Sequence, residues 1–168
     1  MFRRPDRLLL LFLLLSVPFA HGADDPDRTQ PIEIRADSLK ASQKEGVAHY
    51  LGHVIITQGR LTITGDTLTV TIVDGKIRKA VVIGQPARFK KFDYEKKRWI
   101  HGHAHTITYT LKPERQLRLE KAAHIESETG EQLNGAVIRY WPDSQRLEAD
   151  GGKGRVKLVL PPQAGETP

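Results

Sequence analysis

Apolar and polar side chains alternate along most of the chain from Pro31 to Leu160, which is the period of a β-strand with one buried face. In residues 66–72 the apolar positions are Leu68, Val70 and Ile72, with threonine between them. Threonine, valine and isoleucine suit strands because their branched Cβ atoms pack well on a pleated surface. No stretch beyond residue 22 has a convincing helical period, so the pattern predicts an all-β protein.

The predicted strands form a repeating unit that consists of a small residue, an alternating strand, a turn and a returning strand. The units begin at Ala36, Gly65, Ala104 and Gly135. Their turns contain Gly46, Asp74-Gly75, Pro113-Glu114 and Pro142-Asp143. Asp-Gly between alternating strands is a strong hairpin signal, and proline presets the backbone of a turn. The repeat therefore predicts a stack of antiparallel hairpins.

Two of the returning strands meet a bend signal and then resume. One signal is Gly84-Gln85-Pro86, followed by a strand at residues 87–91, and the other is the glycine-rich stretch 151–154, followed by residues 155–160. A strand that breaks at glycine or proline and continues is typical of a sheet that folds over a corner. The pattern predicts two antiparallel sheets that face each other and are open at both ends. We expect the longest loop at residues 91–99.

The first 22 residues have the composition of a secretory signal peptide. Three arginines precede an almost wholly apolar run at residues 8–19, and small residues follow. The run is short for a membrane span, so we expect cleavage after Gly22, with Ala20 and Ala23 as alternative positions. A retained membrane anchor is the other interpretation.

This cleavage predicts a single mature domain at residues 23–160, followed by a disordered tail at residues 161–168. The chain has a formal charge of +6, and loss of the leader leaves +4. It has no cysteine, so neither a disulfide nor a thiolate-bound metal stabilises it. Export excludes nucleic acid as a natural partner. A mildly basic exported surface favours anionic lipid head groups, phosphorylated glycans or other proteins.

Several motifs, in order, resemble the periplasmic lipopolysaccharide-transport bridge proteins, which are the LptA group of the OstA-like family. The matching segments are residues 30–34 with Ala36-Asp37, residues 50–59 and 63–66, Gly84-Gln85-Pro86-Ala87-Arg88-Phe89, residues 102–104, Tyr109 and residues 156–160. They cover nearly all of the mature chain, and their combination is more specific than any one of them. One departure is that histidines occupy positions 101, 103 and 105, where the family pattern has a single histidine after Gly102.

The resemblance implies a twisted, open β-jellyroll whose interior holds the acyl chains of lipopolysaccharide at its lipid A end. It also implies a periplasmic carrier that has no enzymatic activity and needs no cofactor. Copies of such a carrier stack head to tail as a homo-oligomer between an LptC-like inner-membrane protein and an LptD-like outer-membrane translocon. Two alternatives from the same transport system are the anchored inner-membrane partner and the amino-terminal domain of the translocon.

Such a carrier must keep acyl tails dry, because each exposed methylene costs about 0.8 kcal/mol and a tail of about a dozen carbons on the order of 10 kcal/mol. The inward side chains of alternating strands supply a suitable apolar lining. The predicted lining residues are Ile32, Ile34, Phe89, Ile107, Tyr109, Leu111, Leu119 and Ile138. The alternative for each of them is packing in a closed core, which is the usual role of an apolar strand residue.

An open jellyroll also has two edge strands, whose unpaired N–H and C=O groups can pair with another copy. The candidate edges are residues 32–35 and 156–160. Their apolar side chains are Ile32, Ile34, Val156, Leu158 and Leu160. Pairing between unlike edges does not close on itself, so it extends into filaments. The alternative is that the tail covers the second edge.

Two polar clusters permit other interpretations. Five cations lie within nine residues, at Lys90, Lys91, Lys96, Lys97 and Arg98, and they either steer lipid A phosphates or form a solvated loop. His101, His103 and His105 alternate on a strand and could bind zinc or copper, but an exposed strand face is the simpler interpretation. We therefore predict no metal site.

A glycan-acting enzyme is the main alternative from another functional class. It would need two carboxylates that face each other across a cleft, for which Asp66, Glu126 and Glu148 are candidates. None of them lies in a recognisable motif, and the chain has neither Gly-x-Ser-x-Gly nor a cysteine nucleophile. We therefore predict no catalytic residue.

Overall fold

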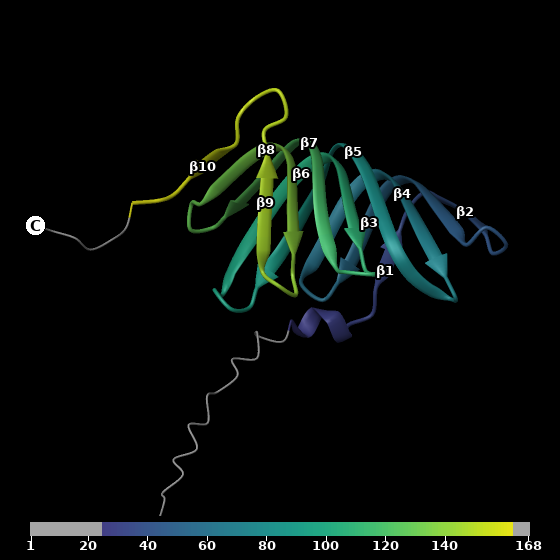
Figure 1. Cartoon of the computed structure of the whole chain (residues 1–168). Helices are drawn as coiled ribbons and strands as arrows, with labels where there is room; N and C mark the ends of the chain where they lie inside the picture. The colour runs from purple at the N-terminus through teal and green to yellow at the C-terminus, as the bar shows by residue number, and fades with distance from the viewer. Residues whose placement is uncertain (1–24, 163–168) are drawn as a thin grey trace, which may run out of the picture.

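The computed structural model describes residues 25–162, which form one short 3₁₀ helix and ten strands (Figure 1). In chain order these are η1 (Pro26–Thr29), β1 (Glu33–Arg35), β2 (Ser38–Ser42), β3 (Val47–Gln58), β4 (Leu61–Val73), β5 (Lys76–Asp93), β6 (Arg98–Thr110), β7 (Gln116–Ser127), β8 (Gln132–Trp141), β9 (Arg146–Asp150) and β10 (Lys157–Val159). The predicted leader and most of the predicted tail lie outside the described residues. Within residues 25–162, no helix has the length and apolar character needed to cross a membrane.

All ten strands belong to one antiparallel sheet, in the order β1-β3-β4-β5-β6-β7-β8-β10. At one edge β1 and β2 pair with different stretches of β3, and at the other β10 and β9 pair with different stretches of β8. The predicted hairpins account for this order, because each strand returns beside the one before it. At the β4–β5 turn, Asp74 and Gly75 have φ angles of 52° and 68°, the left-handed backbone that tight hairpins require.

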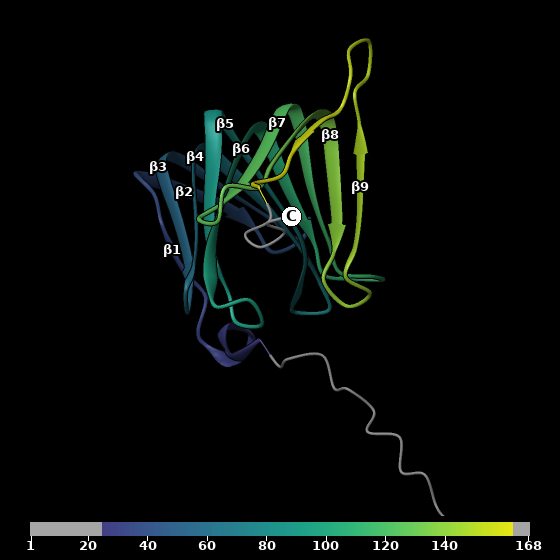
Figure 2. The same cartoon turned by 90° about the vertical axis from the view of Figure 1, so that its left-hand side faces the viewer.

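A line of bulges crosses the sheet and bends it. The pairing shifts between residues 51 and 54 in β3, 64 and 67 in β4, 83 and 87 in β5, 103 and 106 in β6, and 120 and 123 in β7. Bulges bend a strand and increase its twist. Figure 2 shows two arms descending from this bend, with η1 at their lower, open side. The predicted open jellyroll is confirmed, and the two predicted sheets are two arms of one continuous sheet.

We call the two halves the β1 arm and the β2 arm. The β1 arm consists of β1, residues 54–58, 61–65, 87–93, 98–104, 123–127 and 132–135, and β10. The β2 arm consists of β2, residues 47–51, 67–73, 76–83, 106–110, 116–120 and 137–141, and β9. The predicted bend at residues 84–86 lies in the line of bulges, and residues 151–154 carry the chain from β9 to β10.

The predicted loop at residues 91–99 is shorter in the structure, so this expectation was wrong. Strand β5 continues to Asp93 and β6 begins at Arg98, which leaves a turn of residues 94–97. Phe92 pairs with Trp99 across the two strands, and their rings meet edge to face with 5.3 Å between centroids. This aromatic contact keeps the strands paired beyond the point at which charged residues suggested a loop.

The inward faces of the arms consist of rows of directly paired residues that run across the sheet from one edge to the other. In the β1 arm, the Phe89 row is Ile34, Ile56, Ile63, Phe89, Gly102, Ile125, Leu133 and Leu158. In the β2 arm, the Leu119 row is Leu39, Tyr50, Leu68, Val82, Ile107, Leu119, Ile138 and Ala149. The Tyr109 row beside it is Ala41, Ala48, Val70, Ala80, Tyr109, Leu117, Tyr140 and Leu147. Buried members of all three rows form one hydrophobic cluster, so the two arms pack against each other.

Gly102 is the one position in the Phe89 row without a side chain, and a close contact explains it. A Cβ atom at this position would lie 2.2 Å from the Cε1 atom of Phe89. The glycine therefore leaves the space that the phenyl ring occupies.

We expect Gly102→Ala to lower the free energy of unfolding by about 1–3 kcal/mol, because the new methyl group forces the ring to move. In a Phe89→Ala background the ring is absent, and alanine at position 102 should cost less, because only the approach of its Cβ atom to the His124 carbonyl oxygen (2.8 Å) remains. Urea unfolding of the four proteins of this double-mutant cycle measures the coupling. An equal loss of stability in both backgrounds would show that the ring does not decide the identity of residue 102.

The line of bulges contains Lys121 and Ala122 with φ angles of 63° and 55°. A side chain in this left-handed region costs roughly 1–2 kcal/mol, and glycine avoids that cost. We expect Ala122→Gly to raise the free energy of unfolding by up to about 1 kcal/mol, measured by thermal or urea unfolding. The control is Ala104→Gly at a fully buried strand position, which should lower it by about 1 kcal/mol. If both variants lowered the free energy of unfolding, the assignment of backbone strain to the bulge would be contradicted.

Candidate functional site

A cavity of about 390 Å³ lies between the two arms, toward their free ends and away from the line of bulges. The β1 arm contributes Phe89, Phe92, Ile100 and Ile125, and the β2 arm and its β8–β9 turn contribute Leu117, Tyr140, Pro142 and Leu147. At roughly 30 Å³ for a group the size of water, this volume corresponds to about a dozen such groups. The cavity is therefore comparable in size to one acyl tail.

Charged side chains surround this apolar space at its open side. They are Asp25, Arg28, Lys91, Asp93, Glu95, Lys96 and Arg98. Arg98 bonds to Ser127, Thr129 and Glu131, and this guanidinium holds the pKa of the Glu131 carboxyl well below its usual range. The rim thus combines cations and anions around an apolar interior, which suits an amphiphile better than a wholly apolar ligand.

The predicted lining residues occupy different depths. Phe89 lines the cavity, whereas Ile107, Leu119 and Ile138 belong to the Leu119 row and are at most 1% exposed. Tyr109 is half-buried in the neighbouring row, and this burial raises the pKa of its phenol. The three fully buried residues form the packed floor between the arms, so a ligand in the present cavity does not reach them.

The other three predicted lining residues lie near the ends of strands. Ile34 is half-buried at the β1 end of the Phe89 row. Ile32 precedes β1 and is exposed, and Leu111 follows β6 in the turn toward β7. A contact of Ile32 with lipid therefore requires a ligand that extends past the edge of the sheet.

Several cavity residues were missed in the sequence. Ile100 shares the inward register of Gly102 and Ala104, and Leu117 shares that of Leu119. Ile125 lies six residues after Leu119 on the same strand, so strict alternation already places it on the inward face. Leu117 and Ile125 followed from alternation with Leu119, whereas Ile100, seven residues before Ile107, faces inward because the register of β6 shifts between residues 103 and 106.

The apolar rows are covered in their middle and exposed at their ends. Leu39 at one end, and Leu147 and Leu158 at the other, are each at least 50% exposed. Val156 and Leu160 flank β10 and are exposed as well. In the described part of the chain, β1 and β2 pair only with β3, and β9 and β10 pair only with β8. Each end of the sheet therefore presents free strand edges beside exposed apolar side chains.

Residues 25–30, which we call the strap, lie at the open side of the arms. Asp25 caps η1 by accepting a hydrogen bond from the Asp27 amide (3.1 Å), and Pro26 starts the helix. An acidic cap followed by proline is a helix start signal, but no side-chain period follows it, so the sequence pattern did not predict it. The Asp27 carboxylate is 5% exposed and accepts from the Arg60 amide and the Tyr94 hydroxyl, each at 2.8 Å.

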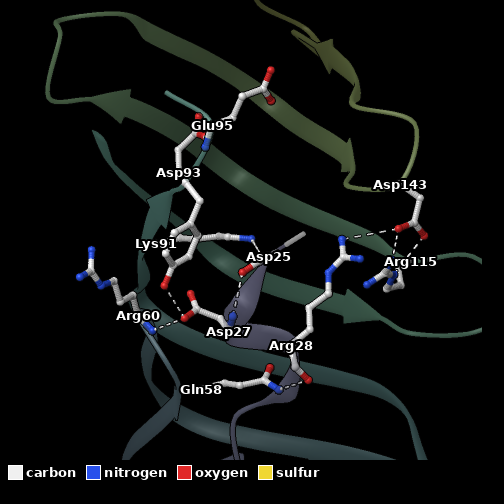
Figure 3. Close-up of polar contacts among 11 residues, drawn as sticks. Asp25, Asp27, Arg28, Gln58, Arg60, Lys91, Asp93, Glu95, Arg115 and Asp143 are labelled. Atoms are coloured by element: carbon white, nitrogen blue, oxygen red, sulfur yellow. Dashed lines mark hydrogen bonds and ion pairs between the residues drawn. The ribbon is translucent and has the colours of Figure 1, made fainter. Parts of the chain in front are cut away.

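Further polar contacts attach the strap to both arms (Figure 3). On the β1 arm, the Gln58 side chain donates to the carbonyls of Arg28 and Gln30, and Lys91 forms an ion pair with Asp25. Toward the β2 arm, Arg28 lies 3.6 Å from Asp143 in the β8–β9 turn. The strap therefore spans the mouth of the cavity from one arm to the other.

A second contact crosses the mouth without the strap. Gln145 in the β8–β9 turn donates a hydrogen bond of 3.2 Å to Glu95 in the β5–β6 turn. Arg115 binds Asp143 within the β2 arm and positions that carboxylate for Arg28. The mouth is thus closed by exposed polar contacts, in contrast to the apolar packing between the arms.

The predicted cluster of five cations divides between two faces of the β1 arm. Lys91, Lys96 and Arg98 line the cavity. Lys90 lies on the outer face, with its ammonium group 4.2 Å from the Trp99 ring centroid. Lys97 is in the turn with a φ angle of 51°. The cluster is therefore not one continuous binding surface.

His101 and His103 lie on the outer face of the β1 arm, where they line a second hollow of about 260 Å³. His103 pairs with His124 of β7, and their rings lie 4.9 Å apart. Burial, His124 and Arg88 all lower the pKa of His103. His105 falls in the bulge and does not line this hollow. Among residues 25–162, no group of three or more histidine, aspartate or glutamate side chains has a metal-binding arrangement.

The three carboxylates considered for a glycan-acting enzyme are on separate elements. Asp66 lies in the bulge of β4, Glu126 on the outer face of β7 beside His124, and Glu148 on β9. None of them lines the cavity between the arms. The structure therefore brings no pair of these groups together across this cleft.

Comparisons with known proteins agree with this architecture. Residues 33–146 match the family described as LptA/(LptD N-terminal domain) LPS transport protein. The chain is 32% identical over 138 residues to the lipopolysaccharide export system protein LptH of Pseudomonas aeruginosa, covering 82% of this chain and 77% of that protein. It is 31% identical over 158 residues to LptA of Escherichia coli, covering 92% of this chain and 84% of the relative.

The crystal structure of LptH from Pseudomonas aeruginosa, described as a periplasmic component of the lipopolysaccharide transport device, superposes with a TM-score of 0.72 at 30% identity. The match covers 81% of this chain and 99% of the LptH chain. The family consists of transport proteins, so the prediction that this chain is not an enzyme is confirmed. The resemblance identified from the sequence motifs is also confirmed: the chain belongs to the LptA/LptD N-terminal-domain family of lipopolysaccharide transport proteins.

Proposed function

We propose that this protein carries lipopolysaccharide through the periplasm with the acyl tails held between its two arms. The observation that carries the proposal is the set of three inward rows, apolar from one edge of the sheet to the other, above a cavity lined by apolar side chains of both arms. A tail of about a dozen carbons costs on the order of 10 kcal/mol in water, and burial against these rows offsets that cost.

The direction of the rows supports transfer of lipid between molecules. They run across the strands, so they end at the two free edges of the sheet, where Leu39, Leu147 and Leu158 are exposed. A second copy that pairs its β1 and β2 edges with the β9 and β10 edges of the first would continue both arms. Such pairing covers exposed apolar side chains and gives partners to free backbone groups. Repeated head to tail, it forms a homo-oligomer.

We further propose that this oligomer connects an LptC-like protein of the inner membrane with an LptD-like translocon of the outer membrane. The same two edges serve for this purpose, since either partner needs only a strand edge beside an apolar face. In this scheme residues 1–22 are removed during export, and residues 23–160 form the carrier. Mass spectrometry of the mature amino terminus distinguishes this carrier from the anchored inner-membrane partner.

Photo-crosslinking tests the position of the acyl tails. A photo-reactive amino acid at Tyr109 or Ile125 on the inward face should capture lipopolysaccharide. The matched controls, Thr108 and Glu126, are the adjacent residues on the outer face and should capture little. Capture is read by an immunoblot for lipopolysaccharide on the purified protein. Equal capture at inward and outward positions would reject binding between the arms.

Charge substitution tests the proposed edge pairing. We expect Leu158→Lys with Leu160→Lys to abolish concentration-dependent oligomers, because an unpaired cation would have to be buried in the continued apolar face. The control is Leu51→Lys, an exposed leucine on the outer face of β3. Molar mass is measured by light scattering over a range of concentrations, with circular dichroism to verify the fold. Oligomers that persist in the double variant would exclude this edge.

A further inference from the structure

The strap differs from the rest of the structure in what holds it. Pro26, Arg28, Thr29 and Gln30 are exposed, and the one buried side chain is that of Asp27. The strap therefore buries no apolar side chain. The Arg28–Asp143 pair is exposed and contributes about 0–1 kcal/mol, the Lys91–Asp25 pair is partly buried, and each hydrogen bond to the Asp27 carboxylate contributes about 1.5–3 kcal/mol. Release of the strap consequently costs far less than separation of the apolar rows.

The buried Asp27 carboxylate lacks part of its hydrogen bonding. Its Oδ1 atom accepts two hydrogen bonds, but its buried Oδ2 atom has no partner within residues 25–162. A buried, unpaired carboxylate oxygen carries a desolvation cost that opposes its hydrogen bonds. Burial and the bond to Asp27 raise the pKa of the Tyr94 hydroxyl, so this contact keeps its proton at neutral pH. The strap is thus held by polar contacts, and its one buried carboxylate is only half satisfied.

The strap also stands where a lipid would pass. Asp25 and Arg28 line the cavity between the arms, and Arg28 reaches Asp143 across its mouth. With the strap closed, the cavity has room for about one tail. A lipid with several tails therefore cannot settle sideways between the arms unless the strap moves.

In the two ion pairs of the strap, another anion can replace the carboxylate. Lys91 and Arg28 are each bound by a carboxylate, Asp25 and Asp143 respectively. A phosphate group carries more charge and more acceptor oxygens than a carboxylate, so it competes well for lysine and arginine. Lys91 belongs to the inward register of β5, on the same face as Phe89, so a phosphate bound to it would sit directly above the apolar interior.

We propose that the strap is a latch over the side opening of the groove. The phosphate groups of a lipid open it by replacing Asp25 as the ion-pair partner of Lys91 and Asp143 as that of Arg28. This inference rests on the proposed function, because it takes the ligand to be a phosphorylated lipid. It adds a phosphate site and a lateral route to the groove. It also assigns the strap a role that edge-to-edge transfer does not require.

A reversible cross-link tests the latch. The chain has no cysteine, so Arg28→Cys with Asp143→Cys can be joined by a reducible bismaleimide that spans the mouth. The matched control is Arg115→Cys with Asp143→Cys, which receives the same reagent within the β2 arm. Binding of fluorescent diphosphoryl lipid A is followed at protein concentrations below the onset of oligomers.

The locked pair should load lipid at least about tenfold more slowly than the same protein after reduction, while the control loads equally before and after. Equal rates for the locked and reduced Arg28/Asp143 pair would overturn the latch. If the wild-type protein fails to bind lipid at all, the proposed function fails, which is a different result from equal rates.

The role of phosphate has its own test. In the wild type, diphosphoryl lipid A should load faster than fully dephosphorylated lipid A. Asp25→Asn keeps the cap of η1 but removes the charge that holds Lys91. It should therefore speed loading of the dephosphorylated lipid and reduce the difference between the loading rates of the two lipids. Equal loading of the two lipids by the wild type would overturn the proposed exchange.

Discussion

The packing of the inward row of the β1 arm against the two rows of the β2 arm is the interaction on which this structure depends. A flat sheet of these strands would leave one apolar face in water. The line of bulges bends every long strand at a similar level, and the two halves of that face then cover each other. Because the bend does not close the sheet into a barrel, both edges remain free and the apolar rows end at exposed leucines.

The two sides of the folded sheet are held by different physical means. Near the bend, small residues such as Ala87, Ala104 and Ala123 let the backbones approach closely. These side chains are almost completely buried. At the open side the arms are joined by the strap and by single polar contacts between turns. Apolar burial is strong and hard to reverse, whereas exposed ion pairs exchange readily. The arms are therefore held by apolar burial along the bend and by polar contacts at the mouth.

Membership of the lipopolysaccharide transport family accounts for an apolar interior that ends at free edges. In an ordinary soluble protein such edges are a liability, because they invite unspecific pairing. The proposed function gives the edges, the exposed row ends and the polar mouth a common use, which is to bind an amphiphile. In the proposed function, its tails would lie on a continuous apolar face and its charged groups beside cations of the rim, among them Lys91 and Lys96.

The sequence by itself determined the features that depend on near neighbours along the chain. The alternation around Leu68 predicts a strand because side chains of a strand point to opposite faces in turn, and Asp74-Gly75 predicts a hairpin because its backbone needs are local. The ordered motifs were sufficient to identify the family. Even the bend at residues 84–86 was visible, since glycine and proline mark it within three neighbouring residues.

Only the tertiary structure decided which apolar residues meet the cavity and what covers it. Phe89 and Ile107 look alike in sequence, yet one borders the open space and the other lies in the packed floor, because depth depends on the facing arm. Asp27 gave no signal, since its partners Arg60 and Tyr94 are more than thirty residues away in the chain. Contacts between distant segments are set by register, bend and closure of the whole sheet. No short stretch of the sequence contains that information.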